Sequence, residues 1–223
     1  MAGWSLKTET DMTQMPEKYV ITVGRSFGSG GHTLAEALAR HFGIAFYDKE
    51  LLSRAAEKAG LSKDYFEEND EREPRFLSGI FAFNMGFNPV HWYSGTSSIS
   101  GDNIYKAQCD FIREIASAGP CVIVGRTADY VLRDMPNVVN IFVHAPIDEC
   151  ARRIMQRSEA PLTHQQAITL AQKTNKLRAN FYNFYSDKHW GRSDSYHLSV
   201  DSSSMPFDEL VEFVADFVRL KLR

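Results

Sequence analysis

The sequence contains few cysteines, no long apolar run and no excess of positive charge, and each absence excludes a class of protein. Its three cysteines lie far apart, so we expect neither a disulfide framework nor a cysteine-ligated metal. No apolar run approaches the roughly 18 residues of a membrane-spanning helix, and the N-terminus lacks the apolar segment of a secretory signal. A net charge of −3 disfavours nonspecific nucleic-acid binding, which needs a basic surface. We therefore expect a cytoplasmic protein that binds neither nucleic acid nor a membrane.

The 223 residues instead contain an alternation of strand and helix patterns. Three apolar runs rich in β-branched residues are typical of parallel strands buried on both faces: "YVITVG" (19–24), "CVIVG" (121–125) and "VVNIFV" (138–143). Shorter strands are expected at "IAFY" and "YHLSVD", and helices at residues 33–42, 49–60, 103–118, 147–157, 163–185 and 206–222. Because such alternation indicates right-handed βαβ units, the sequence predicts a three-layer α/β fold with a parallel sheet and helices on both faces.

Two segments do not fit this alternation. Residues 1–18 are polar and aperiodic and are expected to form a flexible tail, which leaves residues 19–223 as a single domain. Residues 61–103 begin with an acidic run and continue into a turn-rich stretch with several aromatic side chains. Irregular segments of this length are usually lids, substrate-binding insertions or mobile elements. We expect an inserted subdomain here, whose aromatic residues either cover a ligand or form a small core of their own.

The stretch "GRSFGSGGHT" (24–33), between the first predicted strand and the first helix, has the composition of a phosphate-binding loop. Gly28, Gly30 and Gly31 allow main-chain N–H groups to turn inward, and the following helix directs the positive end of its dipole at an anion. Ser29 and Thr33 add hydroxyls, and Thr33 stands where such loops place the hydroxyl that contacts Mg²⁺. The alternative is a tight glycine turn with a purely structural role.

This loop lacks the lysine that most phosphate-binding loops carry, because Gly31 and then His32 occupy that place. Lysine there acts as a point charge on the β- and γ-phosphates. Arg25 lies near the start of the loop and is permanently charged, and a phosphate beside His32 would favour its imidazolium form. Our hypothesis is that Arg25, helped by His32, replaces the lysine. The alternative for His32 is a solvent-facing position on the first helical turn.

Three blocks of the sequence together resemble the cytidylate kinase-like proteins, relatives of bacterial cytidylate kinase among the P-loop nucleoside monophosphate kinases. They are "GRSFGSGGHTLAEALARHFGIAFYDKELL", "VIVGRTADYVLRDMPNVVNIFVHAPIDECARRI", and "NKLRANFY" with "WGRSDSYHLSVDSSSM". The resemblance covers roughly residues 19–60 and 104–220, and includes a variant loop in which glycine and a basic or polar residue replace Lys-Gly. It implies a P-loop NTPase-type sheet with a lid at about residues 153–192 and an acceptor-binding insertion.

The resemblance also implies residues that bind the phosphate acceptor. Asp48 and Arg54 match the Asp and Arg that follow the second strand, and Arg54 would hold the acceptor phosphate unless it is an exposed helix arginine. Arg126 in "VGR" matches a second phosphate-binding arginine. It directly follows a predicted buried strand, where α/β proteins form ligand crevices. Asp129, three residues further on, is another acceptor-side candidate.

On the lid, the resemblance implies that Arg153 and Arg178 contact the nucleotide. With Arg25 and Arg126 they would stabilise the charge on the transferring phosphoryl group. Asn175 stands where bacterial cytidylate kinase has an acidic residue, which weakens the indication that the acceptor base is cytosine. The apolar stripe of the same predicted helix is expected to pack in the core: Leu170, Leu177, Phe181 and Phe184.

Together these features predict a kinase that uses ATP and Mg²⁺ and transfers the γ-phosphate to a nucleoside monophosphate, with CMP or dCMP as the first candidates. No protein nucleophile is required, because the acceptor phosphate is already anionic. Two alternatives stay open. The acceptor could be another small phosphorylated or hydroxylated metabolite, or the protein could be a nucleotide-binding module without catalysis.

Overall fold

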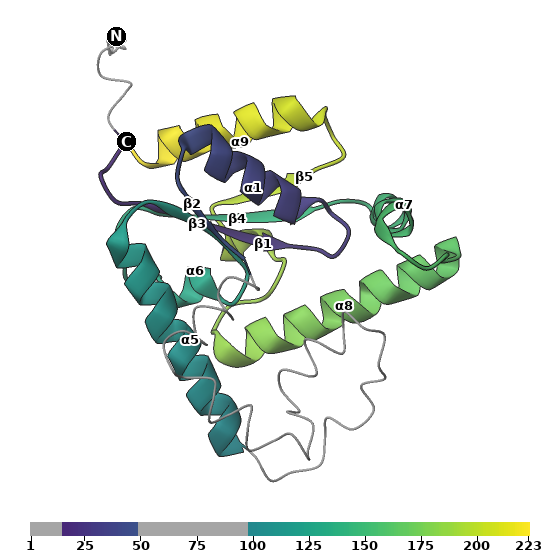
Figure 1. Cartoon of the computed structure of the whole chain (residues 1–223), viewed down its shortest axis with the longest axis horizontal. Helices are drawn as coiled ribbons and strands as arrows, with labels where there is room; N and C mark the ends of the chain where they lie inside the picture. The colour runs from purple at the N-terminus through teal and green to yellow at the C-terminus, as the bar shows by residue number, and fades with distance from the viewer. Residues whose placement is uncertain (1–14, 49–97) are drawn as a thin grey trace, which may run out of the picture.

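The computed structural model describes residues 15–48 and 98–223, which form a sheet covered by helices on both faces (Figure 1). The described sheet has five strands in the order β2-β3-β1-β4-β5, and every neighbouring pair is parallel. The strands are β1 (Val20–Arg25), β2 (Ala45–Tyr47), β3 (Cys121–Val124), β4 (Val138–His144) and β5 (Leu198–Asp201). The predicted three-layer α/β fold is confirmed.

The helices divide between the two faces of the sheet. On one face lie α1 (Gly31–Phe42) and α9 (Phe207–Lys221), and on the other α5 (Ser98–Ala118) and the short α6 (Ala128–Val131) (Figure 1). After β4 the chain forms α7 (Ile147–Arg157) and α8 (His164–Tyr185), which pair through a small apolar cluster: Ala151, Ile154, Ala167 and Ala171. The α7–α8 hairpin therefore starts at the carboxyl edge of the sheet, where α/β proteins place their ligands.

The sequence of the central strand β1 is continuously apolar because the strand packs against a core on each face of the sheet. Ile21 and Val23 pack with α1 and α9 in the larger core, whereas Val20 packs with α5 and α6 in the second core. All three side chains are fully buried, and each such burial contributes about 1.5–3 kcal/mol. Cores on both faces hold β1 in place, and the glycine-rich loop begins at its carboxyl end.

Several boundaries differ from the sequence-based expectation. α5 begins at Ser98, so residues 98–103 belong to this helix and not to the predicted insertion. Their serine, glycine and asparagine residues resemble a turn in sequence, but a helix that has already nucleated gains one backbone hydrogen bond for each residue that it adds. Met15 packs against the larger core, so residues 15–18 are not part of a loose tail. Residues 1–14, the predicted helix at 49–60 and the insertion up to residue 97 lie outside the described residues.

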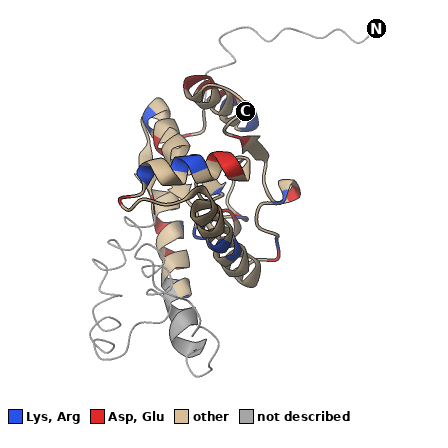
Figure 2. Cartoon of the chain, turned by 90° about the vertical axis from the view of Figure 1, so that its right-hand side faces the viewer, with Lys and Arg blue, Asp and Glu red and all other residues tan. Residues whose placement is uncertain are grey.

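Both acidic and basic residues occur on the helices in the side view of the molecule (Figure 2). Of the helices in the described part of the chain, none is both long enough and apolar enough to cross a membrane. The three cysteines are buried and unpaired.

Candidate functional site

The glycine-rich loop runs from the end of β1 to the start of α1, and two of its glycines have backbone conformations that other residues avoid. Gly28 and Gly30 have φ angles of 81° and 79°. A Cβ atom at Gly28 would also lie 2.6 Å from the carbonyl oxygen of Cys150 in α7. Gly30 is the N-cap of α1. The amino end of this helix therefore opens onto the loop, as a phosphate cradle requires.

The environment of Gly31 explains why the loop has no lysine. A Cβ atom at this position would lie 2.5 Å from Cβ of Arg25 and 3.0 Å from Cβ of Val143, which is too close for any side chain. The Arg25 side chain thus fills the space in which a lysine side chain would begin. Burial lowers the pKa of Arg25 to about 10, and the charge of Asp48 opposes this shift. Arg25 is therefore cationic at neutral pH, beside the place where the lysine charge is missing.

Two further arginines lie beside Arg25, and we call the three the arginine cluster. Nη2 of Arg126 is buried and has no hydrogen-bond partner among the described residues. Burial, and then the charge of Arg25, lowers the pKa of Arg126 to about 10. Arg178, on α8, donates from Nη1 to the carbonyl oxygen of Arg25 (3.0 Å), and the same two causes lower its pKa. Cations that disfavour one another's charged form in this way create a site for a multiply charged anion.

The turn after β3 holds Arg126 in an uncommon backbone conformation. Arg126 and Thr127 have φ angles of 60° and 53°, a region that costs a residue with a side chain about 1–2 kcal/mol. The hydroxyl oxygens of Thr127 and Tyr105 lie 2.8 Å apart in a hydrogen bond, which fastens this turn to α5. Backbone strain of this kind is concentrated at functional sites.

The arginine cluster borders a cavity of about 350 Å³. Carboxylates of Asp48 and Asp129 also line it. Much of the remaining wall is aromatic: Phe27, Phe181, Tyr182, Trp190 and Tyr196. We call this space the acceptor cavity, because it contains three of the predicted acceptor-binding residues, Asp48, Arg126 and Asp129. The fourth, Arg54, lies outside the described residues.

Asp129 is a buried carboxyl group in this cavity. Its Oδ2 accepts a hydrogen bond from the Tyr182 hydroxyl (2.6 Å), and Nζ of Lys188 lies 3.8 Å away. Burial raises the pKa of Asp129, whereas the Tyr182 hydrogen bond and the charge of Lys188 oppose this rise. These contacts hold the carboxyl group in one orientation next to the turn that carries Arg126.

His32 pairs with Asp48, which the sequence did not indicate. Its Nε2 lies 3.1 Å from Oδ2 of Asp48, and its ring meets the ring of Phe46 edge-on. The His32 side chain is 49% exposed, but both His32 and Asp48 line the acceptor cavity. The loop and the end of β2 are thus joined at this point. A part for His32 in phosphate binding stays a prediction.

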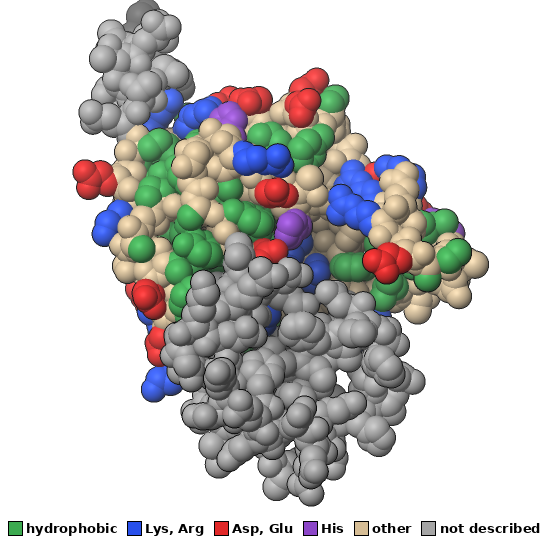
Figure 3. All heavy atoms as spheres, in the orientation of Figure 1, with side chains coloured by type: hydrophobic (Ala, Val, Ile, Leu, Met, Phe, Trp, Pro, Cys, Tyr) green, Lys and Arg blue, Asp and Glu red, His purple; other side chains and the backbone are tan. Residues whose placement is uncertain are grey.

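A second cavity, of about 400 Å³, lies on the other side of the loop, and we call it the donor cavity. Basic side chains line the recess between the body of the domain and α7 in the space-filling view (Figure 3). The lining residues come from the loop, from α1, from α7, from the turn between β5 and α9 and from α9 itself: Ser29, Gly30, Thr33, Glu149, Arg153, Arg157, Ser202, Ser203, Met205, Phe207 and Leu210. The loop therefore separates two cavities, as a transfer between two bound molecules requires.

Arg153 belongs to the donor cavity and not to the arginine cluster. Its Nη1 donates to the carbonyl oxygen of Ser29 and to Oγ of Ser202, both at 2.8 Å. Arg157, one helical turn further on, donates from Nη2 to Oγ1 of Thr33 (3.3 Å). Of the four arginines predicted to be catalytic, the structure brings three together and places Arg153 apart from them.

The described part of the chain offers few side-chain ligands for a magnesium ion. No three His, Cys, Asp or Glu side chains there lie close enough together to hold a metal ion. The ion would thus be bound chiefly by the phosphates of a nucleotide, as is usual for Mg²⁺. The Thr33 hydroxyl fits the predicted contact chemically, and its oxygen accepts one hydrogen bond from Arg157 while a second lone pair is left. The magnesium role of Thr33 stays a prediction.

The contacts of α8 correct the expected packing of its apolar stripe and show what the side chain of Asn175 binds. Leu177 and Phe184 are 38% and 77% exposed, so the predicted core packing is wrong for these two. Oδ1 of Asn175 accepts a hydrogen bond from the main-chain N–H of Phe27 (2.7 Å), which supports the loop.

Comparisons with known proteins agree with this fold. A family model described as "Cytidylate kinase-like family" matches residues 20–204, whereas a search of curated proteins gave no match. An uncharacterized protein from Eubacterium ventriosum is 27% identical in sequence, with a TM-score of 0.67 over 90% of this chain and 98% of that chain. Two other solved structures share the fold: a gluconokinase from Sinorhizobium meliloti (16% identity, TM-score 0.55, 94% and 95% covered) and TT1252 from Thermus thermophilus (19%, 0.55, 93% and 99%).

Proposed function

The chain belongs to the cytidylate kinase-like family, and from this premise we propose that it is a kinase that transfers the γ-phosphate of ATP to a nucleoside monophosphate, with CMP or dCMP as the first candidates. The observation that carries the proposal is the acceptor cavity, where the arginine cluster meets aromatic walls. A nucleoside monophosphate presents the matching pair of features, because it joins a dianionic phosphate to a flat ring.

The acceptor cavity supports a nucleotide better than a sugar phosphate. A sugar phosphate would satisfy the arginine cluster but would make less use of the aromatic wall that includes Phe181, Trp190 and Tyr196. The carboxyl group of Asp129 can accept a hydrogen bond from an exocyclic amino group, such as N4 of cytosine. CMP and dCMP are therefore better candidate acceptors than monophosphates whose bases lack an amino donor.

The transfer itself needs positioning and charge stabilisation. The acceptor phosphate attacks in line, so the protein supplies no nucleophile. The loop amides and Arg25 would hold the donor phosphates, with Arg25 supplying the charge that lysine supplies elsewhere. Arg126 and Arg178 would hold the acceptor phosphate and the transferring group. Mg²⁺, when bound, would neutralise charge on the donor phosphates.

The α7–α8 hairpin is the part of residues 153–192 best placed to act as a lid. It carries Arg157 against Thr33 and Arg178 against the carbonyl oxygen of Arg25. Its two helices are held together by their own apolar cluster. Closing over the loop would exclude water from both cavities during transfer.

A specific observation favours one alternative acceptor. The pair His32 and Asp48 lies in the acceptor cavity with its nitrogen and oxygen 3.1 Å apart. Such a pair can take the proton of a hydroxyl group, which a phosphate acceptor does not require. A hydroxylated metabolite as acceptor is therefore the second candidate.

The acceptor panel separates these functions. The chain is incubated with ATP and Mg²⁺ against nucleoside monophosphates and hydroxylated metabolites, and ADP formation is measured together with thermal stability. Turnover with CMP or dCMP supports the first proposal, and turnover only with a hydroxylated acceptor supports the second. Stabilisation by ATP without turnover on any acceptor would identify a nucleotide-binding module.

A further inference from the structure

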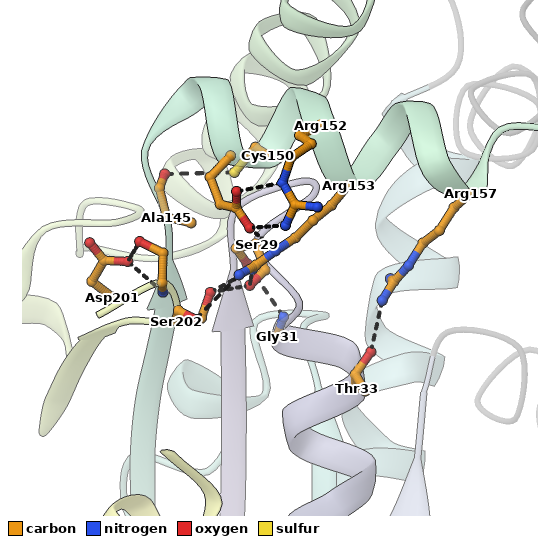
Figure 4. A network of polar contacts seen from close by, with 12 residues as sticks. Ser29, Gly31, Thr33, Ala145, Cys150, Arg152, Arg153, Arg157, Asp201 and Ser202 are labelled. Atoms are coloured by element: carbon orange, nitrogen blue, oxygen red, sulfur yellow. Dashed lines mark hydrogen bonds and ion pairs between the residues drawn. The ribbon is translucent and has the colours of Figure 1, made fainter. Parts of the chain in front are cut away.

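We propose that Arg153 is a positioning residue that fastens the phosphate loop to the turn between β5 and α9, and that it does not touch the transferring phosphoryl group. The inference rests on the proposed role of the loop as the donor site. Figure 4 shows the network, in which the Arg153 side chain runs from α7 across to Ser29 and Ser202. We call this set of contacts the Arg153 link.

The hydrogen bonds of Arg153 leave it little freedom. Nε donates to Glu149 (2.7 Å), Nη1 to the carbonyl oxygen of Ser29 and to Oγ of Ser202, and Nη2 to the carbonyl oxygen of Ser202 (3.3 Å). A guanidinium has five N–H groups, and these contacts occupy most of them. A side chain so occupied cannot also follow charge on a reacting phosphate without breaking these bonds.

Both ends of the link are rigid. Ser29 is fully buried, and its carbonyl oxygen also accepts a hydrogen bond from the hydroxyl of Ser202. The main-chain N–H of Ser202 donates to the carbonyl oxygen of His144 at the end of β4 (2.9 Å). Asp201 accepts two hydrogen bonds from Ser203, which fix the turn after β5. The link therefore joins two ordered main-chain segments that are far apart in sequence.

Both of the joined segments line the donor cavity. Ser29 and Gly30 belong to the phosphate side, and Met205 and Phe207 supply apolar surface on the side of the β5–α9 turn. The link thus sets the distance between the surface that can cover a base and the loop that can hold its phosphates. A nucleotide must satisfy both surfaces at once, so its affinity should depend on this distance.

Arg152 provides a matched control on the same helix. It also binds Glu149, through Nε and Nη2, but it is exposed and makes no hydrogen bond to the loop or to the β5–α9 turn. Replacing Arg152 with Met removes the same charge one residue away from the link. We expect this variant to bind ATP within about twofold of the unaltered protein.

The first test needs no nucleotide. Amide hydrogen exchange is measured for loop residues 26–31 in the ligand-free chain and in the variants Arg153→Met, Arg153→Lys and Ser202→Ala. The link predicts faster exchange of the loop in all three and no change in Arg152→Met. The variant Arg153→Lys should not restore the slow exchange of the loop, because a lysine ammonium group lacks the planar fork of donors with which arginine reaches two segments at once. Unchanged exchange in Ser202→Ala and in both Arg153 variants would overturn the proposal.

The second test measures the dissociation constant of ATP with Mg²⁺ by calorimetry. Ser202→Ala removes no charge, so a purely electrostatic role for Arg153 predicts no effect of this variant. The link predicts weaker binding of about threefold to tenfold, since it removes hydrogen bonds to a charged group. It also predicts that the double variant Arg153→Met with Ser202→Ala loses little more ATP affinity than Arg153→Met alone.

The outcomes separate this inference from the proposed function. If the unaltered chain binds ATP and Ser202→Ala binds it equally well, the link is wrong and the proposed function stands. If the unaltered chain binds no ATP but the loop exchanges faster in the variants, the proposed function fails. In that case the link still stands as a structural brace, without its role in nucleotide binding. Full recovery of ATP affinity by Arg153→Lys would show that charge alone matters and would contradict the link.

Discussion

At the scale of single residues, the loop has a glycine where phosphate loops normally carry a lysine, and an arginine side chain from β1 lies beside this glycine. Arg25 is the last residue of β1, and its side chain lies so close to Gly31 that position 31 has no room for a Cβ atom. A glycine at position 31 and an arginine at position 25 are thus parts of one arrangement. The two residues should therefore tolerate change together better than either does alone.

We expect Gly31→Lys to weaken ATP binding by about tenfold or more, because the new side chain collides with Arg25 and Val143. The double variant Gly31→Lys with Arg25→Gly should recover part of this loss, since it removes the Cβ atom of Arg25 that the new side chain meets and returns a cation. Calorimetric titration with ATP and Mg²⁺ measures both. A single Gly31→Lys variant that binds like the unaltered protein would show that Arg25 does not occupy the lysine position.

The lowered pKa values of the arginine cluster predict a pH dependence of anion binding. Arg25 and Arg126 each have a pKa of about 10 in the ligand-free protein, because burial disfavours the charged form. An anion binds the charged form, so affinity should be constant near pH 8 and should fall as the pH rises through 10. Sulfate, which does not titrate in this range, is the probe for calorimetry at pH 8 and 10.5. Equal affinities at the two pH values would contradict the assignment.

At the scale of elements, α8 supports the loop and also supplies one member of the arginine cluster. Asn175 accepts from the main chain of Phe27, and Arg178, three residues later, donates to the main chain of Arg25. Both residues therefore face the loop from the same side of the helix. Movement of α8 would carry these two contacts with it.

The role of Asn175 can be tested with two substitutions. Asn175→Asp keeps an oxygen that can accept from Phe27, so ATP affinity and the preferred acceptor should change little. Asn175→Leu removes the acceptor and leaves a loop N–H unpaired, which should cost about 1–3 kcal/mol of stability. Thermal unfolding and acceptor kinetics check both. A changed acceptor preference in Asn175→Asp would mean that this residue touches the acceptor base.

The edge strand β5 depends on a neutral histidine. The main-chain N–H of Asn140 donates to Nδ1 of His197 (3.0 Å), which only an unprotonated Nδ1 can accept. Burial, and then the charges of Lys221 and Lys188, lowers the pKa of His197. The unfolded chain therefore binds more protons near its ordinary pKa of about 6.5. This contribution to stability is present above that pH and is lost as the pH falls through it.

We therefore expect the free energy of unfolding to fall between pH 7 and pH 5.5, by at most about 1.4 kcal/mol per pH unit for this one group. His197→Gln should flatten this dependence, whereas His164→Gln, at an exposed position beside Asp148, should not. Urea unfolding followed by circular dichroism measures the effect. The same slope in His197→Gln and the unaltered protein would exclude His197 as its source.

At the scale of the whole molecule, the sequence predicted the layers and the sheet because apolar runs and helical periods are local signals. "YVITVG" and "CVIVG" became β1 and β3, buried on both faces as expected. The sequence also indicated the loop and the arginines, since glycine spacing and a strand-ending "GR" are local as well. The family resemblance implied that Arg153 is one of the catalytic cations, and its position on a helix alone does not show which partner so long a side chain reaches.

The unpredicted contacts all join segments that are distant in sequence. Arg153 binds Ser29 and Ser202, Asn175 binds Phe27, and Gly31 lies against Val143. Residues that form such pairs carry no signature of their own, because serine, asparagine and glycine occur in many loops. Only the fold, by placing the ends of β1, β4 and β5 at one edge, makes these partners visible.

The most direct test of the central claim is the steady-state kinetics of CMP phosphorylation with ATP and Mg²⁺ in two matched variants. Arg126→Met removes a member of the arginine cluster, and Arg133→Met removes an exposed arginine that packs on Tyr130. We predict that kcat/KM for CMP falls by about 10²–10³-fold in Arg126→Met, and stays within about twofold in Arg133→Met. Equal kcat/KM in Arg126→Met and the unaltered protein would contradict the account, as would the absence of turnover with every monophosphate.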